Sequence, residues 1–298
     1  MALIGAGHNV LCAVTQPDRK KGRGLRFKDT AVKLAAKTKE IEVFQPDNVN
    51  SLQSREYLKK KEADLFVVVS YGKILSRQVL DIPKIFCINA HGSLLPKYRG
   101  AAPINWALIK GESETGVTII KMNEEMDAGM MIMQEAISIE AKDNFISLEN
   151  KLFHLAADLL VKAVARIENK KYELIPQDES KVSFAPKLKK EDGLIKWEKP
   201  AREIYNLIRG CVQWPSAFTY YKGKLLKIYG AEVIQLAGET VSGLAGEITD
   251  ISKEGIAVRC GKDTLIIKEL QLEGKRRMSA QEFISGHNIN EGEKLGKD

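Results

Sequence analysis

Short apolar runs alternate with longer amphipathic stretches over the first half of the chain. The apolar runs have the length of β-strands, whereas the stretches between them repeat their apolar residues with the spacing of helices. The predicted strands are 10–15, 42–45, 65–70, 86–90, 116–122 and 131–139. The predicted helices lie near 30–38, 51–61 and 102–110, followed by a long one over 147–169. This alternation predicts an α/β fold with a largely parallel sheet.

The pattern changes after residue 175. Residues 176–199 are polar and rich in lysine, which is typical of a linker. Pro200 then begins a helix that Gly210 is expected to end, and Ser279 with Glu282 has the spacing of a capping box for a last short helix. Between the two helices lie strand-like segments that are separated by glycine-containing turns: 217–221, 225–233, 245–250, 256–259 and 264–272. They predict a small antiparallel barrel, so the chain divides into 1–175, a linker over 176–199, and 200–298.

Composition adds exclusions to this picture. The longest apolar runs, such as LFVVV at 65–69, are far too short to span a bilayer, and we expect neither a secretory signal nor a membrane partner. The four cysteines show no CxxC spacing, which argues against a zinc site and against a disulfide framework: Cys12, Cys87, Cys211 and Cys260. A reduced, cytoplasmic compartment fits this usage best.

The net charge of +7 is unevenly distributed. The run RKKGRGLRFK over 19–28 has six basic residues and no acidic one: Arg19, Lys20, Lys21, Arg23, Arg26 and Lys28. A solvated surface loop would explain such a run. Its two glycines indicate a mobile loop, however, and a mobile basic loop suits docking on phosphates. A second, weaker basic cluster is 275–277.

Candidate chemistry gathers where the strand over 86–90 ends. Asn89 and His91 are two residues apart, so their side chains project from the same face. If 86–90, the helix near 102–110 and the strand over 116–122 form a parallel βαβ unit, the loop after it leaves the same edge of the sheet. That loop, NEEMDAG, contains Glu124, Glu125 and Asp127. A carboxylate could then orient the His91 imidazole for acid–base work while the amide stabilises an oxyanion. Alternatively, Asn89 caps a turn and His91 bonds to the backbone.

The segment INAHGSLLPKYRGAAPINWALIKGESETGVTIIKMNEEMDAG, residues 88–129, resembles the signature region of the folate-dependent formyltransferases. The resemblance implies a Rossmann-like sheet domain over 1–175 and a catalytic set of Asn89, His91 and Asp127. It also implies 10-formyltetrahydrofolate as the formyl donor and no metal. We expect the folate to contact the loop after His91, through Ser93, Leu94, Leu95 and Pro96.

Two further features resemble the members of this family that act on methionyl-initiator-tRNA. They are the segment TQPDRKKGRG over 15–24 and the second domain, which WPSAF at 214–218 opens. The resemblance implies that 200–298 is an OB-like tRNA-binding domain and that the basic run contacts the tRNA acceptor end. The implied role is in translation initiation, for a protein that acts as a monomer.

One departure and two alternatives accompany this resemblance. Family members begin with a central strand and a Gly-Thr-Pro turn before the equivalent of ALIGAGHNV, which is 2–10 here. Without that strand, its neighbours in the sheet are expected to be unpaired. One alternative is a formyltransferase that acts on another amine, such as a sugar nucleotide. The other is a non-catalytic RNA-binding relative.

Overall fold

The computed structural model describes residues 1–21, 26–235 and 243–297. The chain folds into two compact units, which are described one at a time. Unit 1 comprises 1–101, 116–137 and 151–184, and unit 2 comprises 102–115, 138–150 and 185–298. The boundaries are discontinuous because two segments of the first half of the chain belong to the second unit.

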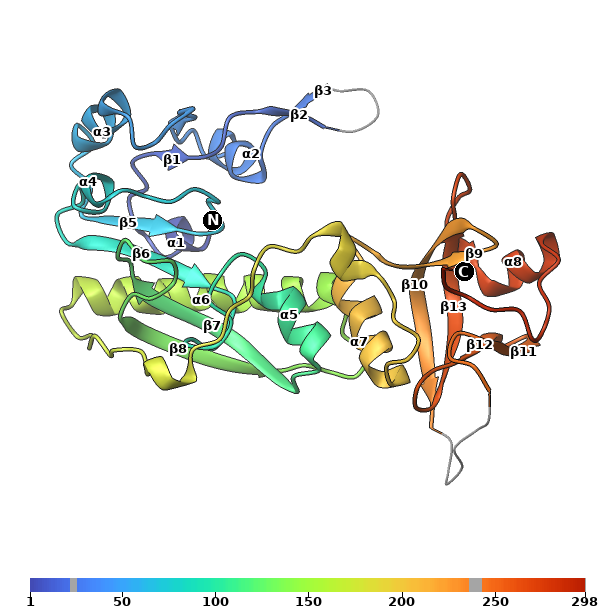
Figure 1. The fold of residues 1–298 in the computed structure, drawn as a ribbon. Coiled ribbons are helices and arrows are strands. Elements are labelled where there is room, and N and C mark those ends of the chain that lie inside the picture. Colours follow the sequence, from blue (N-terminus) through green and yellow to red (C-terminus); the bar gives the residue numbers. More distant parts are fainter. Residues whose placement is uncertain (22–25, 236–242, 298) are drawn as a thin grey trace. The chain divides into compact units, whose positions relative to one another are not determined.

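Unit 1 contains the predicted sheet as two separate parts (Figure 1). In the first part, β1 (Ala13–Val14) pairs in parallel with β4 (Val43–Phe44). The second part has the order β5 (Leu65–Val68), β6 (Phe86–His91), β7 (Glu114–Lys121) and β8 (Met131–Ser138). The α/β class is therefore confirmed.

Among the described residues, β1 pairs with β4 alone and β5 pairs with β6 alone, so one edge of β1 and one edge of β5 have no strand partner. This agrees with the unpaired neighbours that the sequence led us to expect. The carboxyl ends of the two parts are tied by a side chain, since Gln16 Nε2 donates to the Tyr71 carbonyl at 2.9 Å. Both parts contribute to one apolar core, in which Val14, Phe44 and Phe66 pack against buried residues.

The pairing of β6 with β7 corrects one expectation. The two strands are antiparallel, with Ile88 opposite Lys121 and His91 opposite Thr118, so they do not form a parallel βαβ unit. The helix between them, α5 (Pro103–Lys110), has its packing partners in unit 2, where Asn105 Nδ2 donates to the Gly210 carbonyl at 2.8 Å. The chain re-enters the sheet at the edge where it left, since His91 at the end of β6 lies opposite Thr118, whereas Lys121 at the end of β7 lies opposite Ile88, earlier in β6.

Two helices in unit 1 begin at residues whose side chains cap them. Thr30 accepts from Lys33 N, and Ser51 accepts from Ser54 N, which satisfies donors at the starts of α2 and α3. The helices of this part of the chain are α1 (Ala2–Gly5), α2 (Ala31–Lys37), α3 (Leu52–Lys59), α4 (Arg77–Leu80) and α6 (Phe145–Glu168). The sequence pattern predicted α2, α3 and α6, and α4 was not predicted.

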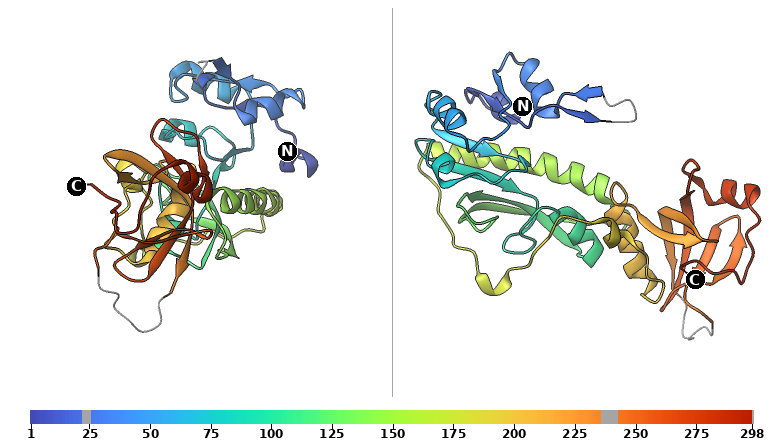
Figure 2. Two further views of the ribbon diagram at one scale, coloured as in Figure 1. Left: turned by 90° about the vertical axis from the view of Figure 1, so that its right-hand side faces the viewer. Right: turned by 45° about the horizontal axis from the view of Figure 1, so that its top comes forward.

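The long helix α6 is readily followed in Figure 2. A stripe of side chains along it is at most 3% exposed: Leu148, Leu152, Leu159, Ala163 and Ile167. Their spacing of four positions, or of seven over two turns, keeps them on one face of the helix. The amphipathic pattern that predicted this helix is therefore the pattern that buries it.

The basic run forms a short hairpin at its two ends. In the backbone, β2 (Arg19–Lys21) pairs with β3 (Arg26–Lys28) in antiparallel fashion. Residues 22–25 lie outside the described residues. The run was expected to be a loop without strands, so the hairpin is a correction to its local structure.

Unit 2 is built on an antiparallel sheet in the order β11-β12-β13-β10-β9, with β14 beside β13. Its elements are α7 (Ala201–Cys211), β9 (Ala217–Tyr221), β10 (Lys224–Ile234), β11 (Ile248–Ser252), β12 (Gly255–Arg259), β13 (Thr264–Leu272), β14 (Met278–Ser279) and α8 (Ala280–Gly286). The capping box of Ser279 with Glu282 is present. The predicted strands and the antiparallel sheet are confirmed.

The C-terminal segment 292–296 bridges the two outer strands of this sheet. Gly296 N donates to the Tyr220 carbonyl in β9 at 2.9 Å, and Ile248 N in β11 donates to the Glu293 carbonyl at 2.8 Å. Leu295 N also donates to the Gly246 carbonyl at 2.8 Å. The exposed backbone edges that an open sheet would leave are thus occupied by this segment.

Gly210 does not end α7, contrary to the prediction, because the helix continues to Cys211. A Cβ at Gly210 would lie 2.7 Å from Ile109 Cγ1 and 3.1 Å from the Asn105 carbonyl oxygen. The residue is therefore a glycine because α5 packs closely against α7. It does not act as a helix terminator.

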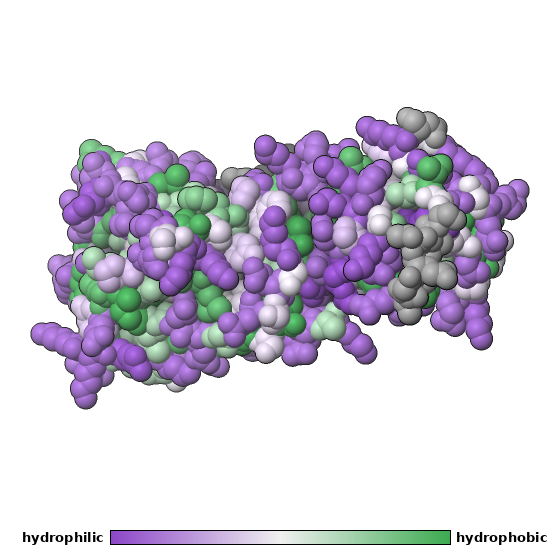
Figure 3. Space-filling view, turned by 60° about the horizontal axis from the view of Figure 1, so that its bottom comes forward, coloured by the Kyte–Doolittle hydropathy of each residue, from purple (hydrophilic) through white to green (hydrophobic). Residues whose placement is uncertain are grey.

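Polar side chains cover most of the face drawn in Figure 3, and apolar residues appear on it in several separate patches. Apolar atoms make up more than half of an ordinary protein surface, so such patches do not identify a binding site by themselves. Among the described residues, no helix combines the length and the apolar character that crossing a membrane requires.

Candidate active site

Strand β6 positions two of the three candidate catalytic side chains. Its first residues, Phe86, Cys87 and Ile88, are buried and anchor it in the sheet. Asn89 follows as a half-buried residue, and His91, on the same face, is 5% exposed. The strand therefore places an amide and an imidazole side by side at its carboxyl end.

The hydrogen bonds of His91 determine which ring nitrogen can react. Nε2 lies 2.9 Å from the Tyr98 carbonyl oxygen, and because a carbonyl can only accept, Nε2 carries the proton. The other nitrogen, Nδ1, lies 3.5 Å from Asp127 Oδ2. In the neutral ring, Nδ1 is thus the nitrogen that can take up a proton, and a carboxylate lies beside it.

Asp127 lies in the loop between β7 and β8. Its Oδ2 accepts from Gly100 N at 2.9 Å, and its Oδ1 lies 3.4 Å from Asn89 Nδ2, which donates to it. Its backbone has a φ of 53°, a left-handed conformation that aspartate adopts more readily than most residues. Both neighbouring carboxylates, Glu124 and Glu125, are exposed. The carboxylate that meets Asn89 and His91 is Asp127.

The route by which Asp127 arrives differs from the one the sequence predicted. Lys121, at the end of β7, lies opposite Ile88 in β6, and Met122 N donates to the Cys87 carbonyl at 2.9 Å. The loop that follows therefore starts near the beginning of β6 and must turn back along it to reach Asn89. The three residues meet although the two strands are antiparallel.

The alternative interpretation of these residues is correct in one respect. His91 does bond to a backbone carbonyl, as a purely structural histidine would. However, its second nitrogen faces a carboxylate, and Asn89 donates to the same carboxylate instead of capping a turn. This arrangement provides an amide donor, a proton acceptor and a carboxylate within one small volume, which is suited to acid–base chemistry.

The loop after His91 is held by internal bonds. The Ser93 side chain is 0% exposed and donates to the Lys97 carbonyl, and Leu95 is 3% exposed. Thr118 Oγ1 accepts from Leu95 N at 3.1 Å and donates to the Ser93 carbonyl at 2.7 Å. Leu94 and Pro96 are half-buried. Of the four residues expected to contact folate, these two have side chains that are partly accessible.

Sequence reasoning missed the residues that hold the site together. Gln177 donates to the Asp127 and Gly129 carbonyls, each at 2.8 Å, and accepts two hydrogen bonds from Arg99. Gly100 supplies the backbone donor to Asp127. Gln177 falls in the segment predicted as a polar linker, and no local pattern distinguishes it from the surrounding polar residues.

The expected tRNA-binding residues are described only in part. Arg19, Lys20 and Lys21 belong to β2, and Arg26 and Lys28 belong to β3. Arg23 lies outside the described residues, and the side chains of the other five basic residues are also not described.

Other kinds of site find little support in the described parts of the chain. They contain no group of three or more His, Cys, Asp and Glu side chains that could hold a metal ion. Burial raises the pKa of the thiols of Cys87, Cys211 and Cys260 to about 12. Thiols with such values are protonated near neutral pH, so these three are not nucleophiles.

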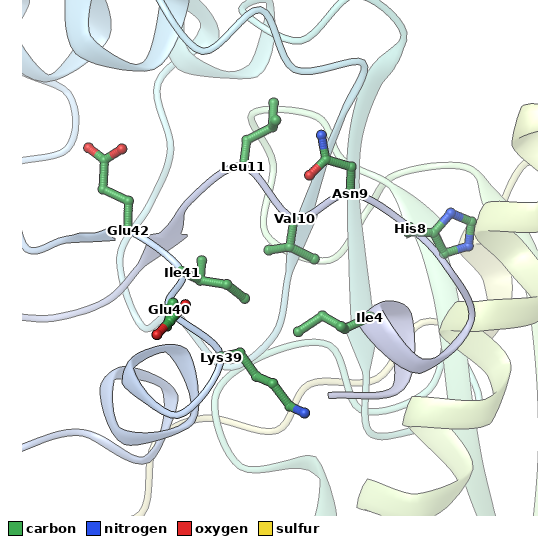
Figure 4. A pocket seen from close by; sticks show the side chains of 9 residues that line it. All are labelled: Ile4, His8, Asn9, Val10, Leu11, Lys39, Glu40, Ile41 and Glu42. Atoms are coloured by element: carbon green, nitrogen blue, oxygen red, sulfur yellow. The ribbon is translucent and has the colours of Figure 1, made fainter.

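A pocket of about 500 Å³ in unit 1 is separate from the candidate active site (Figure 4). It is lined by residues from α1, from the segment before β1 and from 39–42. The side chains of Ile4, Val10 and Ile41 point toward one another in it. None of Asn89, His91 and Asp127 lines this pocket.

Comparisons with known proteins extend these observations over the whole chain. A family model described as "Formyl transferase" matches 2–164, and one described as "Formyl transferase, C-terminal domain" matches 187–288. The chain is 42% identical over 295 residues to the methionyl-tRNA formyltransferase of Alkaliphilus oremlandii, covering 99% of this chain and 94% of that protein. It is 44% identical over 296 residues to the protein of the same name from Pelotomaculum thermopropionicum, with the same coverage.

Solved structures show the same fold at lower identity. The N-formyltransferase from Helicobacter canadensis, in complex with folinic acid and dTDP-3-aminofucose, has a TM-score of 0.63 and 18% identity, covering 87% of this chain and 99% of its own. HypX from Aquifex aeolicus, in complex with tetrahydrofolic acid, has a TM-score of 0.61 and 18% identity. The match covers 84% of this chain and 43% of that one. With both family models matched and relatives at this identity along nearly its full length, the chain belongs to the formyltransferase family.

Proposed function

We propose that this protein transfers the formyl group of 10-formyltetrahydrofolate to the α-amino group of methionyl-initiator-tRNA. The observation that carries the proposal is the meeting of Asn89, His91 and Asp127, because acylation of an amine needs a proton acceptor and an oxyanion donor. The choice of acceptor is supported by relatives named methionyl-tRNA formyltransferase, 42% and 44% identical over 99% of the chain.

His91 serves as the proton acceptor. A free α-amino group has a pKa of about 7.7–8.0, so a weak base is sufficient to keep it neutral as it attacks. Because Nε2 donates to the Tyr98 carbonyl, Nδ1 takes the proton from the amine. The Nε2 hydrogen bond to Tyr98 orients the neutral ring, and Asp127 Oδ2, at 3.5 Å from Nδ1, stabilises the imidazolium that results.

Asn89 serves as the donor to the oxyanion that develops on the formyl carbonyl. Its hydrogen bond to Asp127 is long, at 3.4 Å, and holds the amide plane in a fixed orientation. Since one amide nitrogen has two N–H groups, it can serve both partners. Loss of one such donor typically lowers turnover by about a hundred- to a thousandfold.

The formyl donor binds at the loop after His91, with the accessible contacts made by Leu94 and Pro96. The loop fits an apolar ring system, because it presents half-buried apolar side chains beside the catalytic strand. Ser93 and Leu95 contribute by holding the backbone in shape. When bound, the folate supplies the activated formyl group.

The remaining assignments concern the whole chain. We propose a catalytic domain over 1–175, a linker over 176–199 and an OB-like tRNA-binding domain over 200–298, which is consistent with family matches at 2–164 and 187–288. The six basic residues of the run over 19–28 contact the tRNA acceptor end. The protein acts as a monomer in the cytoplasm, where translation initiates.

The test is direct. The purified chain is incubated with 10-formyltetrahydrofolate labelled with ¹³C in the formyl group, and separately offered methionyl-initiator-tRNA and a dTDP-amino sugar. We expect label on methionine released from the tRNA. Label on the sugar alone would replace the proposal with sugar formylation; the N-formyltransferase from Helicobacter canadensis is found in complex with such a dTDP-amino sugar. Retention of tRNA on a filter without transfer to either acceptor would favour the non-catalytic alternative.

A further inference from the structure

We propose that Gln177 is a positioning residue that holds Asp127 in its working geometry. The inference rests on the proposed function, in which Asp127 stabilises the protonated form of His91. It assigns a role to a residue of the polar segment after α6. Within the described residues, the hydrogen bonds of the Gln177 side chain go to Arg99, Asp127 and Gly129, so any effect on His91 must pass through the loops that contain these residues.

The carboxamide of Gln177 makes four hydrogen bonds. Its Oε1 accepts from Arg99 Nε at 2.9 Å and from Arg99 Nη2 at 2.8 Å. Its Nε2 donates to the carbonyl oxygens of Asp127 and Gly129, both at 2.8 Å. One side chain therefore connects the loop after β6, which contains Arg99, to the loop after β7, which contains Asp127.

The loop after β6 is itself held in place by several hydrogen bonds. Arg99 is 6% exposed, and its Nη2 also donates to Glu179 Oε1 at 2.7 Å. Arg99 N donates to the Ser183 carbonyl at 2.9 Å. The next residue, Gly100, donates its N–H to Asp127 Oδ2. Asp127 is thus fixed at two points, its carbonyl by Gln177 and its carboxylate by Gly100.

Both points are needed because of the backbone of Asp127. A φ of 53° is uncommon for a residue other than glycine and persists where the surroundings hold it. Loss of the Gln177 bonds would therefore shift Asp127 relative to His91 and leave the rest of the sheet in place.

The chemistry of the site requires glutamine. A primary amide offers two N–H donors and an oxygen with two lone pairs, and all four are used here. Glutamate would keep the acceptor but would place a carboxylate against two carbonyl oxygens. Methionine keeps the length and approximate volume and loses all four bonds. These two substitutions, Gln177→Met and Gln177→Glu, are the test variants.

Glu179→Gln is the matched control. Glu179 also binds Arg99, but its side chain is 73% exposed, and within the described region its carboxylate bonds to Arg99 alone. We expect Gln177→Met to lower kcat by about 10- to 100-fold, because small misplacements of catalytic groups cost that much. KM for aminoacyl-tRNA should stay within about twofold, since binding groups are untouched. Glu179→Gln should retain kcat within about threefold.

A double-mutant cycle separates positioning from general damage. In an Asp127→Asn background, Gln177→Met should lower kcat by no more than about twofold, because its effect passes through the group already removed. Full multiplication of the two single effects would overturn the proposal. Should Gln177→Met fail to fold, Gln177→Glu carries the same cycle, since it retains the contact with Arg99.

Amide hydrogen exchange gives a readout that needs no activity. The Gly100 N–H is protected by its bond to Asp127 Oδ2, so Gln177→Met should speed its exchange by about tenfold or more. In the same variant, the amides of β6 should exchange as in the wild type. In Glu179→Gln, the Gly100 amide should also exchange as in the wild type. Unchanged exchange at Gly100 in both Gln177 variants would overturn the inference. A wild type that formylates no acceptor would instead overturn the proposed function, and the exchange experiment would still decide the role of Gln177.

Discussion

Asp127 is the residue on which the geometry of the candidate site depends. Its two carboxylate oxygens meet an amide, a backbone N–H and an imidazole that come from different parts of the chain. A glutamate at this place would carry the same charge but would extend one methylene further, and a glutamate is close by at Glu125. Asp127 nevertheless occupies the site. Its backbone is left-handed, a conformation that aspartate adopts more readily than most residues.

Substitution of His91 by alanine tests the catalytic role at this scale. His91→Ala should lower the kcat of formylation at least about 100-fold, since general base catalysis typically contributes that much. Binding of methionyl-tRNA, measured by filter retention, should change little because His91 is 5% exposed.

The matched control for this change is His8→Ala. His8 lines the separate pocket of Figure 4 and is half-exposed, so its removal should leave turnover near that of the wild type. A His91→Ala protein that keeps most of its kcat would remove His91 from the catalytic set.

At the scale of elements, close packing between helices accounts for a glycine that sequence rules misassigned. Gly210 is the penultimate residue of α7 and has no left-handed backbone, so alanine would normally be preferred there by up to about 1 kcal/mol. Gly210→Ala should instead destabilise the protein by about 1–3 kcal/mol, because the new methyl group would overlap Ile109 and the Asn105 carbonyl. Urea denaturation followed by circular dichroism measures the change.

Gly286→Ala serves as its control. Gly286 ends α8, and a Cβ there would meet nothing within 4 Å. This substitution should be neutral or slightly stabilising. Equal stability of Gly210→Ala and wild type would show that α5 and α7 can move apart at no cost.

The C-terminal segment that bridges β9 and β11 is anchored by Glu293. Burial alone would raise the pKa of this carboxyl, but hydrogen bonds from Tyr221, Lys222 and Asn290 lower it to about 2. Because the folded-state pKa lies below the unfolded value, this stabilisation is present above pH 4.5 and is lost as the pH falls toward 2.

Glu293→Gln should therefore reduce the free energy of unfolding at pH 7 by about 2 kcal/mol, as expected for hydrogen bonds to a charged group. The difference from wild type should shrink as the pH is lowered from 5 to 3, in urea titrations at each pH. Glu291→Gln, at an exposed position in the same segment, should show no such trend. A constant difference at every pH would argue against an ionised Glu293 as the anchor.

At the scale of the whole molecule, salt dependence distinguishes tRNA from a small acceptor. A nucleic-acid backbone can engage all six basic residues of the run over 19–28, whereas a sugar nucleotide offers one or two phosphates. Alanine at all six positions should raise the KM for methionyl-tRNA and flatten its dependence on salt. The log–log slope should fall by about 0.7 for each phosphate that the protein no longer neutralises. Initial rates against salt at saturating folate measure it.

The second basic cluster provides the control for this experiment. Arg276 is paired with Glu282, and Arg277 is paired with Glu269. Since these two cations are already neutralised within the protein, alanine at Arg276 and Arg277 should leave the salt slope nearly unchanged. An unchanged slope in the six-residue variant as well would leave the run over 19–28 as a solvated surface segment.

The sequence by itself predicted most of the elements and named the candidate catalytic residues. Helix and strand patterns are local, because they follow from the spacing of apolar side chains along a few turns or pleats. The stripe on α6, the strands over 217–221 and 264–272, and the capping box at Ser279 were therefore predictable. Asn89, His91 and Asp127 could be named as well, because the residues around them resemble a known family.

Tertiary structure alone decided how those residues meet. The strand patterns of β6 and β7 do not show that the two strands are antiparallel, nor that α5 between them bonds to α7, nearly a hundred positions further along the chain. The bonds of Gln177 join a segment that looks like a linker to two loops 48 to 78 positions earlier. Such contacts leave no periodic trace, because a side chain that bonds to a distant backbone is not constrained by its neighbours in the chain. For this reason the candidate catalytic residues were visible in the sequence, and the residues that hold them were not.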